Sequence, residues 1–185
     1  MNKGDINSIY DTVNSFYLDR KQTLKYITVN GYDVLYDNKV VFLGTLTPDK
    51  TKPVDGKALM LVWGNCDTMA IECEWKDTKL VEESIIKVRG LEKPLWQFQI
   101  PECLSKISVK NDQKEPFWEL GEPIFYEGYL KNRQNEGECI FYHDYQTKKI
   151  AKYQKFENGE RVRLIDDKFI HPKILESIET EFLYS

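Results

Sequence analysis

The sequence predicts a mainly β fold of the α+β class, in which successive antiparallel hairpins form one sheet between an N-terminal and a C-terminal helix. Aromatic residues make up 13% of the chain, and such residues favour the pleated, half-buried surfaces of strands. Short strand-like segments separated by turn dipeptides fill most of the middle of the chain. Helical periodicity is clearest near the two ends. At 185 residues the chain is long enough for a substantial core, and we treat residues 1–185 as a single domain.

Residues 1–22 predict an amphipathic N-terminal helix. Apolar residues recur there at the spacing of one helical face: Ile6, Ile9, Tyr10, Val13, Phe16 and Tyr17. Asp5 directly precedes this face. It is the expected N-cap, because its carboxylate can accept a hydrogen bond from the first turn.

The chain then changes to strand-like segments. Between residues 24 and 46 three short apolar runs are separated by Asn30-Gly31 and Asp37-Asn38, which predict a β-meander. A further hairpin is expected over residues 57–75, with its turn at Gly64-Asn65. Residues 80–123 are less regular, and we interpret their polar segment 108–116 as an exposed loop.

The β pattern resumes after residue 123 and continues to about residue 165. A C-terminal helix is then expected over residues 170–185, because Ile174, Leu175, Ile178 and Phe182 share one helical face. Pro172 suits the first turn of such a helix.

An internal duplication is visible in the glycines and aromatic residues. Each copy contains an aromatic-x-Gly-x-Leu segment, a second glycine and a closing aromatic residue. In the first copy these are Phe42-Leu43-Gly44-Thr45-Leu46, Gly56 and Trp75. In the second copy they are Tyr126-Glu127-Gly128-Tyr129-Leu130, Gly137 and Phe156. In both copies 18 residues separate the second glycine from the closing aromatic residue. We therefore expect the two glycines in equivalent turns and the two closing aromatic residues in equivalent buried positions.

This pattern resembles the membrane occupation and recognition nexus (MORN) repeat. The resemblance covers a first unit at residues 40–80 and a second at residues 124–165, with residues 81–123 as an insertion that does not repeat. The residues that this resemblance marks as defining the repeat are Gly44, Gly56, Trp75, Tyr126, Gly128, Gly137, Phe156 and Gly159. Cys73 and Gln154 replace a usual second glycine, and Thr78 stands where the other copy has Gly159. The resemblance implies a non-enzymatic stack of hairpins that serves in scaffolding, in dimerisation and sometimes close to membranes.

Composition excludes several specialised classes. The net charge of −4 does not indicate a nucleic-acid-binding protein, and no apolar run approaches the length of a membrane span. The start of the sequence lacks the apolar segment of a secretory signal, so we expect a cytoplasmic protein. None of the four cysteines forms a C-x-x-C pair. We interpret them as reduced thiols, with a disulfide in an exported domain as the alternative, and expect neither cofactor nor metal.

Recognisable catalytic motifs are absent from the sequence. No nucleophile elbow and no phosphate-binding glycine loop occurs. Glu72 and Glu74 would share one face of a strand, where charged residues on a solvated face are the ordinary explanation. The predicted function is therefore a non-catalytic protein-interaction or scaffold module. A β fold that binds a small ligand or lipid in an apolar pocket, and an enzyme without a recognisable motif, remain alternatives.

Two groups of residues are candidates for contact with a partner. Trp96 and Trp118 lie in the part that does not repeat, where an exposed tryptophan would anchor a partner protein. Residues 148–163 contain six basic residues against two acidic ones, and the candidates among them are Lys148, Lys149, Lys152 and Lys155. This segment is either a solvated face or a contact for an anionic phospholipid surface or an acidic protein. A protein partner is expected, and self-association stays open.

Overall fold

The computed structural model describes residues 1–63, 68–91, 100–110, 117–120, 124–144 and 149–162. Its elements are α1 (Lys3–Arg20), β1 (Lys25–Val29), β2 (Tyr32–Tyr36), β3 (Val40–Leu43), β4 (Gly56–Trp63), β5 (Thr68–Lys76), β6 (Lys79–Leu80), β7 (Ile86–Leu91), α2 (Ile100–Ser105), β8 (Ile107–Lys110), β9 (Phe117–Leu120), β10 (Ile124–Lys131), β11 (Gln134–Asp144), β12 (Lys149–Glu157) and β13 (Glu160–Arg161). The prediction of a mainly β protein with an N-terminal helix is confirmed. The predicted C-terminal helix lies outside the described residues.

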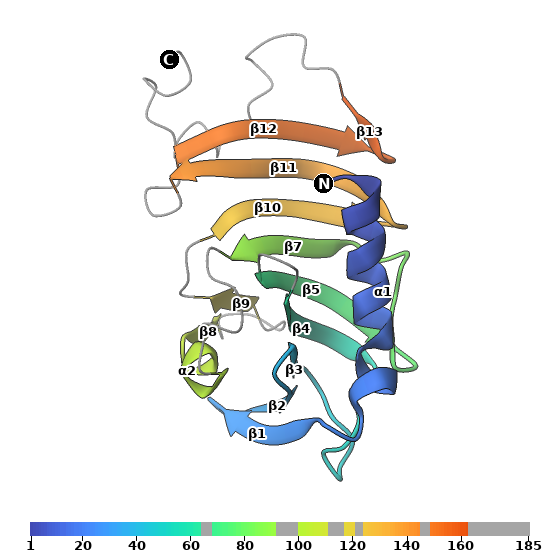
Figure 1. Cartoon of the computed structure of the whole chain (residues 1–185), viewed down its shortest axis with the longest axis vertical. Helices are drawn as coiled ribbons and strands as arrows, with labels where there is room; N and C mark the ends of the chain where they lie inside the picture. Colours follow the sequence, from blue (N-terminus) through green and yellow to red (C-terminus); the bar gives the residue numbers. More distant parts are fainter. Residues whose placement is uncertain (64–67, 92–99, 111–116, 121–123, 145–148, 163–185) are drawn as a thin grey trace.

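Eleven strands form one antiparallel sheet whose order follows the chain (Figure 1). The order is β1-β2-β3-β4-β5-β7-β10-β11-β12-β13, and the short β6 pairs with the end of β5. Between β7 and β10 the chain leaves the sheet to form α2 and a separate β8–β9 hairpin. Part of the insertion that we expected at residues 81–123 therefore belongs to the main sheet, since β7 is one of its strands.

Helix α1 crosses the strands on one face of the sheet (Figure 1). It buries Ile6, Tyr10, Val13 and Phe16, which all belong to the predicted apolar face. The predicted N-cap is wrong: the cap is Asn2, whose side-chain oxygen accepts the backbone N–H of Asp5 at 2.9 Å. The helix begins one turn before its apolar face, so the first apolar residue does not mark its start.

Both faces of the sheet carry apolar side chains, because strand residues alternate between faces. On the α1 side, Phe42 and Trp75 pack with the helix. On the opposite side, Leu43 packs with Leu104 of α2 and Ile107 of β8. The expected loop at 108–116 is wrong in its first part, because residues 108–110 pair with β9 as a strand.

An arginine in the β10–β11 turn holds α1 against the sheet. Arg133 donates from Nε and Nη2 to the carboxylate of Glu82, at 3.1 Å and 2.8 Å, and from Nη1 to Asp11 of α1 at 2.8 Å. Its guanidinium also lies 5.3 Å from the ring centroid of Tyr10. Asn14 of α1 donates to Glu82 at 3.1 Å. The Arg133 side chain thus links α1, the β10–β11 turn and the segment between β6 and β7.

The duplicated segments have the same strand pairing. Strands β3, β4 and β5 of the first unit correspond to β10, β11 and β12 of the second, and each set ends in a short fourth strand. Gly56 pairs with Trp75, and Gly137 pairs with Phe156. Both glycines have positive φ angles, 142° and 65°, which other residues adopt only with strain.

The aromatic-x-Gly segments share one physical cause. In each segment the aromatic ring folds over the glycine two residues later. A methyl group on Gly44 would lie 2.9 Å from two carbons of the Phe42 ring, and one on Gly128 would meet the Tyr126 hydroxyl. Glycine at these positions therefore makes room for the ring.

The closing aromatic residues differ in their burial. Trp75 is 1% exposed and meets the rings of Phe16 and Phe42. Phe156 lies near the far edge of the described sheet and is only partly buried. The two units are therefore alike in pairing but unlike in packing.

Candidate functional site

A cluster of charged side chains lies on the sheet face opposite α1. Lys87 and Arg89 of β7 point to this face, since their neighbours Ile86 and Val88 pack on the α1 side. The Glu127 carboxylate of β10 lies 3.1 Å from Arg89 Nε and 3.4 Å from Lys87 Nζ. One carboxylate on β10 therefore faces two cations on β7.

Arg89 is the most buried member of this cluster, with 7% of its surface exposed. A second carboxylate, on Glu72 of β5, lies 3.8 Å from its Nη2. A buried guanidinium requires such counter-charges, because removing it from water without them is costly. The carboxylates of two adjacent strands supply them.

Three tyrosines lie on the same sheet face as the charged cluster. The Tyr142 hydroxyl of β11 donates to Glu127 Oε2 at 3.0 Å. Tyr153 of β12 hydrogen-bonds to Glu138 of β11. Tyr129 of β10 is 36% exposed and lies within the electrostatic range of both glutamates. We call these residues together the tyrosine face: Glu72, Lys87, Arg89, Glu127, Tyr129, Glu138, Tyr142 and Tyr153.

The electrostatics of the tyrosine face fix its protonation at neutral pH. Burial of Glu127 opposes its ionisation, but Lys87, Arg89 and the Tyr142 hydroxyl outweigh burial and hold the pKa of Glu127 below its usual value. Burial raises the pKa of Tyr129 and Tyr142, and the Glu127 charge raises both further. Burial and the bond to Glu138 raise the pKa of Tyr153 to about 12.

These shifts bear on the chemistry available to the face. General acid–base catalysis favours groups with a pKa near the working pH. The pKa shifts of the four titrating residues all lead away from neutrality, so one carboxylate stays ionised and three hydroxyls stay neutral. The arrangement is therefore suited to binding through fixed charges and hydroxyls.

The candidate contact residues predicted from sequence do not come together on this face. Trp96 and Lys148 lie outside the described residues. Trp118 belongs to β9 and Lys149 is the first residue of β12, and the structure describes only their backbone. Lys152 and Lys155 of β12 lie on opposite faces of the strand, and Lys155 Nζ lies 3.7 Å from Glu157.

The cysteines show no sign of a reactive or metal-binding role in the described part of the chain. Cys73 and Cys139 are buried and not in disulfides, and burial raises the pKa of Cys73 to about 12. Such a group remains a thiol at neutral pH.

No three His, Cys, Asp or Glu side chains of the described residues are grouped to hold a metal ion. Among those residues, too, no helix has both the length and the apolar character needed to cross a bilayer.

Sequence reasoning missed most of the tyrosine face. The available signal was the alternation of polar residues in two strands, Lys87-x-Arg89 and Glu127-x-Tyr129. Each pair marks one face of its own strand. The pairing of β7 with β10, which brings Arg89 next to Glu127, spans the segment that leaves the sheet and could not be read from the pattern.

Comparison with known proteins adds no relative to this description: no family model, no curated protein and no solved structure matches the chain.

Proposed function

We propose that this chain is a non-catalytic protein-interaction module and that the tyrosine face is its partner-binding surface. The observation that supports this most directly is the position of Tyr129 and Tyr142 near Arg89, with Tyr153 further along the same face of the sheet. Tyrosine and arginine supply much of the binding energy in protein interfaces. Such a role agrees with the scaffold function that the MORN resemblance implies.

The rigidity of the face supports the same proposal. Its side chains project from paired strands, and the Tyr142 hydroxyl is already fixed by its bond to Glu127. Side chains held in this way lose little conformational entropy when a partner binds. A partner therefore meets a surface that is already organised.

The ion pairs of the face are also compatible with a role in recognition. Replacing a buried ion pair by apolar residues is often neutral or stabilising, so the pair of Arg89 with Glu127 is weak evidence for a purely structural role. Charges on an interface instead select partners with complementary charges.

We propose the cytoplasm as the compartment, because Cys73 and Cys139 are free thiols.

Affinity capture from the native host, read out by mass spectrometry, tests this proposal. The chain carrying Tyr129→Ala and Tyr153→Ala is compared with the unmodified chain and with Tyr26→Ala. Tyr26 is a matched control, since it is 42% exposed on β1 at the other edge of the sheet. The proposal expects at least one partner that the double variant loses and the control keeps.

Two outcomes would contradict the proposal. One is an unmodified chain that enriches no protein above an unrelated bait. The other is a double variant that keeps every partner while its circular dichroism and unfolding midpoint stay unchanged. If the partner is a second copy, the unmodified chain sediments as a dimer and the double variant as a monomer.

A further inference from the structure

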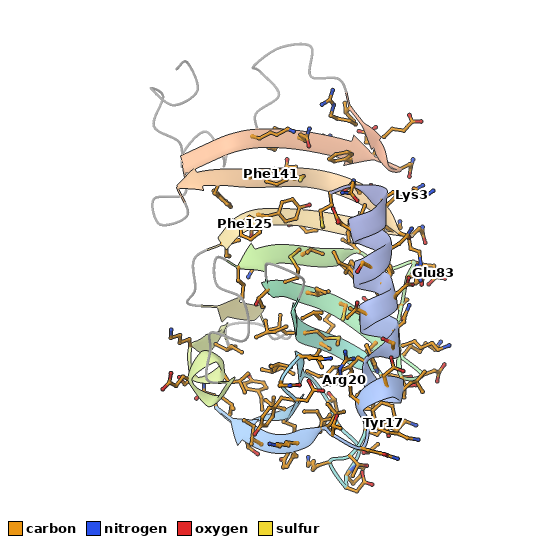
Figure 2. The ribbon with its side chains drawn as sticks, viewed as in Figure 1. Lys3, Tyr17, Arg20, Glu83, Phe125 and Phe141 are labelled. Atoms are coloured by element: carbon orange, nitrogen blue, oxygen red, sulfur yellow. The ribbon has the colours of Figure 1, made fainter. Side chains whose placement is uncertain are left out.

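Strand β1 forms one end of the sheet, and its outer edge has no partner strand among the described residues (Figure 1). Its five residues, Lys25–Val29, all pair with β2 in one unbroken register. Helix α1 ends nearby, where Figure 2 labels Tyr17 and Arg20, but the helix lies over a face of the sheet rather than along its edge. The outer side of β1 is therefore a place where a further strand could add to the sheet.

The β1–β2 hairpin fixes which backbone groups point outward. Val29 and Tyr32 flank the two-residue turn Asn30-Gly31, and such a closing pair exchanges hydrogen bonds across the hairpin. Bonded and non-bonded pairs alternate along an antiparallel ladder, so Tyr26 and Thr28 direct their N–H and C=O groups away from β2. None of these groups bonds to another described residue. Tyr26 and Thr28 thus offer free donors and acceptors along the edge.

The opposite end of the described sheet carries features that discourage pairing with another chain. Its last strand, β13, consists only of the exposed Glu160 and Arg161, and the adjacent β12 contains three lysines. Very short strands and lysine-rich strands protect sheet edges in this way. Strand β1 has a single charged residue, Lys25 at its start, and neither a proline nor a bulge. The contrast indicates that β1 is suited to a partner strand.

We propose that two copies of this chain pair through β1, antiparallel to each other, around a two-fold axis at Ile27. In this register Tyr26 of each copy lies opposite Thr28 of the other, so the outward groups of both copies all form hydrogen bonds. Lys25 lies opposite Val29 of the other copy, and the two lysines are about 14 Å apart, so no like charges meet. A two-fold contact closes on itself and gives a dimer. The contact lies outside the tyrosine face and does not depend on the proposed function.

The side chains of β1 favour a second copy as the partner. Ile27 and Val29 are only partly buried on the side of the sheet that carries α2, and the proposed register places Ile27 of one copy beside Ile27 of the other. On the opposite side, Tyr26 is 42% exposed and comes to lie beside Thr28 of the other copy. Pairs of an aromatic and a β-branched residue on neighbouring strands stabilise a sheet. One strand therefore supplies both members of each favourable pair.

Sedimentation equilibrium of the full chain tests the proposal. Two five-residue strands make a small contact, whereas stable interfaces bury roughly 1,200–2,000 Å². We therefore expect a weak dimer with a dissociation constant of about 0.1–0.3 mM, measured between about 0.02 and 1 mM chain. Amide hydrogen exchange at Tyr26 and Thr28 should slow about threefold over this range, as the monomer fraction falls. A chain that stays monomeric throughout the range overturns the proposal.

A pair of substitutions at Thr28 locates the contact. Thr28→Pro removes the outward N–H, whereas Thr28→Val keeps it together with the β-branched shape. Because this N–H does not bond to β2, a proline is tolerated there, and circular dichroism checks that the fold is kept. We expect Thr28→Pro to abolish the dimer and Thr28→Val to retain it. If the proline variant does not fold, Thr28→Lys replaces it, because a lysine in an edge strand opposes pairing.

The same measurement separates this contact from the tyrosine face. The double variant with Tyr129→Ala and Tyr153→Ala should form the β1 dimer as the unmodified chain does. A dimer that survives Thr28→Pro, or Thr28→Lys in its place, uses another surface and overturns the proposal. A dimer that only the double variant loses would belong to the tyrosine face and would overturn it as well.

Discussion

Asp77 donates its backbone N–H to the carboxylate of Asp55 at 2.9 Å, and this bond joins the β5–β6 turn to the residue just before β4. The second unit contains the equivalent bond, from the Asn158 backbone N–H to Glu136 at 3.1 Å. Both bonds join residues 22 positions apart, and both acceptors directly precede the second glycine of their unit. The duplication therefore extends from backbone pairing to a specific side-chain bond.

The β5–β6 turn, which donates this bond, leads to the first prediction. Thr78 adopts φ 65° at the position where the second unit has Gly159 with φ 82°. This left-handed conformation costs a β-branched residue about 1–2 kcal/mol, whereas glycine adopts it freely but loses about 0.5–1 kcal/mol in chain entropy. We expect Thr78→Gly to raise the free energy of unfolding by about 0.5 kcal/mol.

The reverse change, Gly159→Thr, provides the comparison. It should lower the free energy of unfolding by about 1–2 kcal/mol, because a Cβ at this position would also crowd the Gln134 side chain at about 3.0 Å. Urea denaturation of both variants measures these values. A loss of stability in Thr78→Gly would show that the turn is not strained.

The second prediction concerns the closing aromatic residues. Trp75→Ala should lower the free energy of unfolding by about 3–5 kcal/mol, because it empties a fully buried site beneath α1. Phe156→Ala should cost about 1–2 kcal/mol, since its ring is only partly buried. Urea unfolding midpoints, with the slope of the transition checked for each variant, measure the difference. Equal losses would contradict the difference in packing between the two units.

The third prediction concerns the pH dependence of the Arg133 contacts. The hydrogen bonds from Arg133 hold the pKa of Glu82 below its ordinary value of 4.5. Their contribution to stability is therefore complete above the unfolded pKa and is lost as pH falls through the folded pKa. We expect Arg133→Gln to lower the free energy of unfolding by about 1 kcal/mol at pH 7, because the groups are partly exposed.

Denaturation of the same variant at about pH 2–3, below the ordinary Glu82 pKa, completes this test. Most of the difference from the unmodified chain should vanish there, leaving only the contact of the guanidinium with the Tyr10 ring. Arg133→Lys keeps the charge but not the forked geometry, and should retain part of the effect. A loss that is the same at both pH values would show that Arg133 acts through packing alone.

The parts of the fold that were predictable from sequence depend on local signals. The Asn30-Gly31 dipeptide has positive φ at both residues and forms the turn expected between β1 and β2. Trp75 is buried, as its position at the end of a duplicated segment suggested. The N-cap of α1, Asn2, was missed because it precedes the apolar pattern.

The candidate site depends on contacts between distant parts of the chain. Arg89 and Glu127 each alternate with apolar neighbours, which places each on one face of its strand. Which strand lies beside β7 is decided by where the chain returns after the β8–β9 hairpin. No short pattern around Arg89 contains that information, so the sequence predicted the strands but not their shared face.

The strand order has a consequence for the kinetics of folding. Most neighbouring strands of the described sheet follow one another along the chain, so their pairing requires only short loops to close. The β7–β10 pair is different, because the whole segment 92–123 must be enclosed before Leu91 meets Ile124. We expect the strands from β1 to β7 and the strands from β10 to β12 to become protected from hydrogen exchange as two separate units. The hydrogen bonds between β7 and β10 should form last. Pulse-labelled hydrogen exchange would detect this order, and early protection of the Lys87–Arg89 amides against β10 would contradict it.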